Sequence, residues 1–134
     1  NNSDYLDKLS ELASLHSFIR ISPPVARKNL PDLLNRNDAF IHAFQGSLDK
    51  TLIEATLAGL PVITINNEYL NEFGTWSQRN TSIDLDNEFS AFMSSPNDQI
   101  EKLCKTRQQI AITKHSFDQW QTQLLRIFDD LMSS

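Results

Sequence analysis

The side chains best suited to chemistry lie together in one segment of the chain, GSLDKTLIEATLAGLPV. A helix through this segment turns by about 100° per residue, which places Lys50, Thr51 and Glu54 on one polar face close to its N-terminus. Ser47 belongs to the same face and can cap the helix. First-turn N–H groups and the helix dipole favour a bound anion, most often a phosphate, and Gly46 lets the backbone approach it closely. The pattern therefore predicts an anion site at the start of this helix.

Two charged side chains of this face suggest what the anion belongs to. Lys50 adds a point charge suited to a diphosphate. Glu54 lies one turn further along and is a good acceptor for a pair of sugar hydroxyls, as acidic residues are in other nucleotide-binding folds. A nucleoside diphosphate lying along the helix would use both groups. The alternative is an ordinary pair of opposite charges, four residues apart, on a solvated helix face.

The elements that must position these residues alternate between helices and strands. The expected order is a helix ending near residue 16, a strand over 18–21, a helix over 29–37, a strand over 39–43, a helix over 48–58, a strand over 61–65, a helix over 68–73, an edge strand over 82–85 and then helices, the last beginning at Ser116. Such alternation predicts an α/β fold with a Rossmann-like parallel sheet and flanking helices. Ligands bind beyond the carboxyl ends of the strands in that architecture, which is where the turn at Gly46 lies.

Composition excludes several other classes of function. The net charge is −5 and no basic run exceeds Arg27-Lys28, so we expect no nucleic-acid partner. Three glycines cannot form the Gly-rich dinucleotide or P-loop motifs. One cysteine and three histidines give no metal cluster and no internal disulfide, so we expect no metal and no cofactor. No apolar run is long enough for a membrane span.

The same segment resembles the donor-binding segment of retaining glycosyltransferases of the GT-B fold, family 4. The likeness rests on Leu-Ile-Glu-Ala at 52–55, followed by Ala-Gly-Leu-Pro-Val-Ile at 58–63. Gly-Ser-Leu-Asp-Lys at 46–50 is similar to a variant found in bacterial members. The resemblance extends more weakly over residues 5–132, including Asp38 before the second strand and His115 before the last helix.

The resemblance implies a role for each matching residue. Glu54 stands where the family binds the ribose hydroxyls. Ser47, Leu48 and Asp49 match the loop and helix start whose backbone amides approach the diphosphate and the donor sugar, and Lys50 supplies charge to the phosphates. Gly46 stands where the family has its first glutamate, so the resemblance assigns no catalytic residue.

For the whole chain, the resemblance implies a single Rossmann-like donor-binding domain over residues 1–134, belonging to a longer, two-domain enzyme. That enzyme would transfer a hexosyl group from a nucleotide-diphosphate sugar to a glycan or lipid-linked acceptor, as in polysaccharide biosynthesis. Its partner would be an N-terminal acceptor domain. We expect a cytoplasmic protein, with peripheral association at the inner face of the membrane through that other half. Transfer would need both halves.

Two other functions stay open, and four further features each have a structural alternative. The chain could be a non-catalytic α/β interaction module, or a GT-B-like nucleotide-sugar epimerase domain. We interpret His42 as a core histidine more readily than as a base, and Trp76 as a packing residue more readily than as a stacking surface. Cys104 fits a structural thiol. Asp84 and Asp86 spell a D-x-D metal motif but fit a strand end and a helix cap better.

Overall fold

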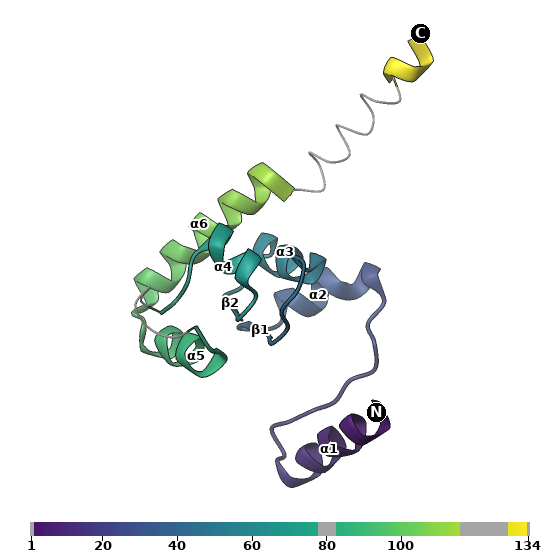
Figure 1. The fold of residues 1–134 in the computed structure, drawn as a ribbon, viewed down its shortest axis with the longest axis vertical. Coiled ribbons are helices and arrows are strands. Elements are labelled where there is room, and N and C mark those ends of the chain that lie inside the picture. The colour runs from purple at the N-terminus through teal and green to yellow at the C-terminus, as the bar shows by residue number, and fades with distance from the viewer. Residues whose placement is uncertain (1, 78–82, 116–128, 134) are drawn as a thin grey trace. The chain divides into compact units, whose positions relative to one another are not determined.

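The computed structural model describes residues 2–77, 83–115 and 129–133, and these form a mixed α/β structure that is mostly helical (Figure 1). The elements are α1 (Asn2–Leu15), a 3-10 helix η1 (Arg27–Asn29), α2 (Leu30–Asn35), β1 (Phe40–His42), α3 (Lys50–Leu57), β2 (Val62–Thr64), α4 (Asn67–Phe73), α5 (Leu85–Ser94) and α6 (Asn97–His115). The chain divides into two compact units, Asn1–Leu30 and Pro31–Ser134.

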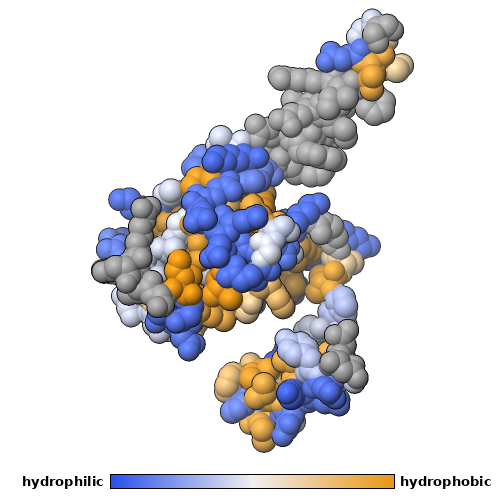
Figure 2. Space-filling model, in the orientation of Figure 1, coloured by the Kyte–Doolittle hydropathy of each residue, from blue (hydrophilic) through white to orange (hydrophobic). Residues whose placement is uncertain are grey.

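The first unit contains α1 and η1. Its helix confirms the one predicted to end near residue 16. The strand predicted over 18–21 is wrong, since these residues form no strand, and Phe18 and Ile21 are exposed. Apolar periodicity indicates a tendency to be buried, but a strand also needs a partner to complete its hydrogen bonds. Figure 2 shows apolar and hydrophilic side chains side by side over this unit.

The second unit is built around one β-α-β crossover. β1 and β2 are parallel neighbours, with Phe40 opposite Val62 and His42 opposite Thr64. Both strands were predicted, and α3 connects them, so the carboxyl ends of the strands lie at one edge of the sheet (Figure 1). α3 packs against β2 and α6, α4 packs against α6, and α5 packs against β2. The core residues that are 2% exposed or less are Leu52, Ala55, Val62, Ile63, Tyr69, Phe73 and Ala111.

Side-chain caps decide where three of the helices begin. Asp49 caps α3, because its carboxylate accepts the N–H of Thr51 at 3.0 Å, and the predicted cap at Ser47 is therefore wrong. Asn66 caps α4 through the N–H of Tyr69. At Asp84 the structure has the cap of α5, so the edge strand predicted over 82–85 is wrong for its described residues.

The end of α3 was predicted correctly. Gly59 has φ +82°, a left-handed conformation that favours glycine. Its N–H donates to the carbonyl of Thr56 at 3.0 Å, and the N–H of Leu60 donates to that of Ala55 at 3.1 Å. This pair of bonds is a Schellman motif, which satisfies the last carbonyls of a helix. After Gly59, only Leu60 and Pro61 precede β2, which begins at Val62.

Two buried charges hold α6 and α5 to the rest of the second unit. Arg107 of α6 is 1% exposed, and its guanidinium donates to the carbonyls of Val62, Phe73 and Gly74 at 2.8–3.2 Å. Burial lowers the pKa of Arg107. Glu88 of α5 is fully buried and accepts the backbone N–H groups of residues 76 and 77. These long-range contacts have no local sequence signal.

Trp76 has the packing role predicted for it. Its indole N–H donates to the carbonyl of Val62 at 2.8 Å, and its ring lies 4.9 Å from the Arg107 guanidinium and 5.1 Å from the ring of Phe92.

The helix predicted from Ser116 onward lies mostly outside the described residues. In the described part of the chain, none of the helices has the length and apolar character needed to cross a membrane.

Candidate functional site

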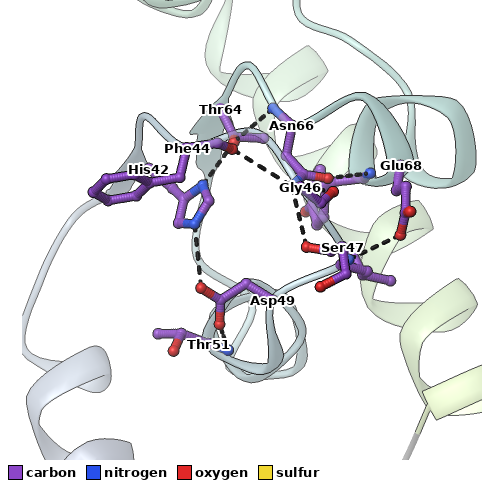
Figure 3. Close-up of polar contacts among 11 residues, drawn as sticks. His42, Phe44, Gly46, Ser47, Asp49, Thr51, Thr64, Asn66 and Glu68 are labelled. Carbon is purple, nitrogen blue, oxygen red and sulfur yellow. Dashed lines mark hydrogen bonds and ion pairs between the residues drawn. The ribbon is translucent and has the colours of Figure 1, made fainter.

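The predicted site lies at the carboxyl ends of β1 and β2, in the turn that joins β1 to α3 (Figure 3). Gly46 in this turn has φ +128°, which disfavours other residues. A Cβ added there would meet no atom within 4 Å, so the conformation, rather than crowding, is what calls for glycine. The turn is therefore open on the side where that Cβ would lie.

The side chain of Asn66, the residue before α4, holds the turn in place. The residue is 1% exposed, and its Nδ2 lies 3.4–3.5 Å from the carbonyl oxygens of Phe44, Gly46 and Ser47. Its Oδ1 caps α4, and its backbone N–H donates to the Thr64 hydroxyl at 3.1 Å. One amide therefore connects the turn, the end of β2 and the start of α4. Sequence reasoning missed Asn66, whose only signal was its place directly after a predicted strand and before a predicted helix.

Carboxylates of the chain itself bind two backbone amides of this segment, one in the first turn of α3 and one in the turn before the helix. Asp49 accepts the N–H of Thr51, and Glu68 of α4 accepts the N–H of Leu48 at 2.8 Å. Amides at a helix N-terminus bind negatively charged groups, so the contact at Thr51 follows the same physics as the predicted phosphate. Glu68 was not predicted as a site residue. It reaches the turn because α4 begins at the same edge of the sheet.

His42 is a buried histidine with both ring nitrogens in hydrogen-bonding distance of a partner, which confirms the interpretation as a core residue. Its Nδ1 lies 3.1 Å from the Thr64 hydroxyl, and its Nε2 lies 3.3 Å from Oδ2 of Asp49. The order hydroxyl, imidazole, carboxylate is that of a nucleophile and its base. However, Thr64 is fully buried and no substrate can reach its oxygen, so this trio is not a hydrolytic centre.

The first-turn amide and His42 also set the charge state of Asp49. The N–H of Thr51 lowers the pKa of the Asp49 carboxyl most, burial opposes it, and the hydrogen bond with His42 lowers it further. The side chain is 47% exposed, which leaves much of the charge in contact with solvent. Asp49 is therefore an ionised cap at neutral pH.

The remaining predicted residues lie on α3 as its periodicity requires. Lys50 is exposed in the first turn, while Thr51 and Glu54 are half-buried. Ser47, Lys50 and Thr51 therefore lie close to the start of the helix, and Glu54 lies one turn further along.

Asp84 and Cys104, which were also considered from the sequence, lie outside this turn, at the start of α5 and on α6. Asp84 of the D-x-D motif caps α5 and Asp86 lies in the first turn, so the predicted helix cap is present but falls on Asp84, and the predicted strand end is wrong. Cys104 is buried, and burial raises the pKa of its thiol, as a structural cysteine requires. Among the described residues, no group of three histidine, cysteine, aspartate or glutamate side chains could hold a metal ion.

Comparison of the chain with protein-family models, curated proteins and solved structures finds no match.

Proposed function

We propose that this chain is the nucleotide-diphosphate-sugar-binding domain of a retaining glycosyltransferase, built as one Rossmann-like half of a GT-B fold. Its full enzyme would transfer a hexosyl group to a glycan or lipid-linked acceptor. The observation that carries the proposal is the match between the motif of residues 46–63 and its position: a turn at the carboxyl end of a parallel strand, followed by a helix and the next strand.

Three features of that segment support the proposal. Gly46 adopts a positive φ in an open turn, which gives a phosphate access to the backbone. Lys50 is exposed in the first turn of α3 and can meet a phosphate. Glu54 lies one turn further along the same helix, at the position expected for contact with a ribose.

The carboxylate of Glu68 favours a second function, that of a non-catalytic interaction module. It accepts the N–H of Leu48, an amide assigned above to the diphosphate. A donor that uses this amide must displace Glu68. An interaction module binds no donor, so its Glu68 can keep the contact with the Leu48 amide. Gly46 in place of the family's first glutamate is also compatible with such a role.

A nucleotide titration of the 134-residue chain separates the two functions. We expect uridine or guanosine diphosphate, followed by amide NMR at millimolar concentration, to shift the signals of residues 46–51. Glu54→Gln should weaken binding about tenfold or more, the ratio that corresponds to about 1.4 kcal/mol. Glu68→Gln should strengthen binding, because it removes a competing anion from the Leu48 amide.

Glu101→Gln is the matched control, since it makes the same change of charge at an exposed position of α6. Its affinity should equal that of the unmodified chain. The proposal is contradicted if neither nucleotide shifts the turn, or if all three glutamate variants bind alike. Either result would favour the interaction module.

A further inference from the structure

His42 connects the end of the sheet to the first turn of α3. Its ring is 7% exposed and lies between two aromatic rings, with centroid distances of 6.3 Å to Phe40 and 5.4 Å to Phe44. The aromatic neighbours and the bond to Thr64 fix the plane of the imidazole. The Nε2 of a ring held in this way can orient the partly exposed carboxylate of Asp49 (Figure 3).

The hydrogen-bonding groups define which nitrogen of the neutral ring carries the proton. An ionised carboxylate only accepts, so Nε2 must donate to Asp49. Nδ1 is then an acceptor, and it takes the hydroxyl proton of Thr64. The Thr64 oxygen in turn accepts the N–H of Asn66 at 3.1 Å. Each group in this series therefore has a partner of the correct kind.

We propose that His42 is a positioning residue of the nucleotide site: it holds Asp49 in the orientation that caps α3 and so fixes the turn before the helix. This inference rests on the proposed function for its ligand. The series of bonds runs from the N–H of Asn66 through Thr64, His42 and Asp49 to the N–H of Thr51. Asn66 also holds the carbonyls of the turn, so the same series joins the turn to the helix that follows it.

A matched pair of variants separates the two sides of the imidazole. The amide of Gln can reach the place of Nε2, so His42→Gln keeps a donor for Asp49. The shorter amide of Asn reaches only the place of Nδ1, so His42→Asn keeps the Thr64 contact and loses Asp49. Both variants remove the ring, and a purely structural role of the imidazole would affect them alike.

The test uses the chain without nucleotide first. In His42→Asn we expect the pKa of Asp49, followed by NMR of its carboxyl carbon, to rise toward 3.8, and exchange of the Thr51 amide to become about fivefold faster, the factor for a cap worth about 1 kcal/mol. In His42→Gln both values should stay close to those of the unmodified chain. The proposal is overturned if the two variants give the same values.

A measurement on the unmodified chain guards against a variant that does not fold. Imidazole nitrogen NMR should show the neutral ring of His42 protonated on Nε2, and a proton on Nδ1 overturns the proposal. In the nucleotide titration, His42→Asn should bind about fivefold more weakly than His42→Gln. If neither chain binds nucleotide while the ligand-free results hold, the proposed function fails and the positioning of Asp49 stands.

Discussion

Replacing Asn66 by aspartate tests whether one buried amide organises the turn at the candidate site. Asn66→Asp keeps the shape and the oxygen that caps α4, and aspartate is as good a cap as asparagine. What changes is the group facing the carbonyls of Phe44, Gly46 and Ser47, where a donor becomes an acceptor. The variant therefore isolates the donation by Nδ2.

The size of the effect follows from the distances. The three contacts of 3.4–3.5 Å are longer than a good N–H···O bond of about 2.9 Å, so we count them together as one bond. Loss of a buried donor costs about 1–3 kcal/mol, and a buried carboxylate facing carbonyl oxygens adds to it. We expect Asn66→Asp to lower the free energy of unfolding by about 2–4 kcal/mol at pH 7.

The assay is urea unfolding at several pH values. Burial among carbonyls should raise the folded-state pKa of the new carboxyl group, so the penalty is present above that pKa and shrinks as the group is protonated at lower pH. Asn67→Asp is the control, because it makes the same change at an exposed first-turn position of α4 and should change stability by less than about 0.5 kcal/mol. Equal losses in the two variants, or a loss at position 66 that does not depend on pH, would refute the reasoning.

Two further predictions concern charged groups. Arg107→Met should lower the free energy of unfolding by about 2–4 kcal/mol, because carbonyls in the core lose a buried donor, whereas Lys105→Met at an exposed position of α6 should have little effect in the same urea experiment. The folded-state pKa of Asp49 is below 3.8, so its contribution to stability is present above pH 3.8 and is lost as the pH falls through the lowered value. Asp49→Asn keeps a capping oxygen and should reduce this acid-dependent loss, and an unchanged acid profile would count against the assignment.

Local patterns in the sequence predicted the parts of the fold that depend on neighbouring residues. The two apolar strands, the helix between them and its end at Gly59 all follow from periodicity and turn chemistry. The cap of α3 was misplaced, because Ser47 and Asp49 can both cap a helix. In the structure Asp49 is the cap and also contacts His42, seven residues away, a contact that local sequence pattern does not predict.

The rest of the fold and of the site depends on contacts between distant segments. Asn66 and Glu68 reach the turn only because α4 begins at the same edge of the sheet as α3. The strand predicted over 18–21 failed for a related reason, since an apolar run does not specify a pairing partner. The burial of Arg107 could not be predicted from the sequence, because a lone basic residue on a helix is usually solvated.

The central claim is that Glu54 binds the ribose of a nucleoside diphosphate, and a comparison of ribose with deoxyribose tests it most directly. We predict that the unmodified chain binds the ribonucleotide more tightly than its 2′-deoxy form, by about tenfold if one charged hydrogen bond is lost. Glu54→Gln should remove most of this difference, whereas Glu101→Gln should preserve it. Equal affinity of the unmodified chain for the two nucleotides, or the same discrimination in Glu54→Gln, would contradict the account.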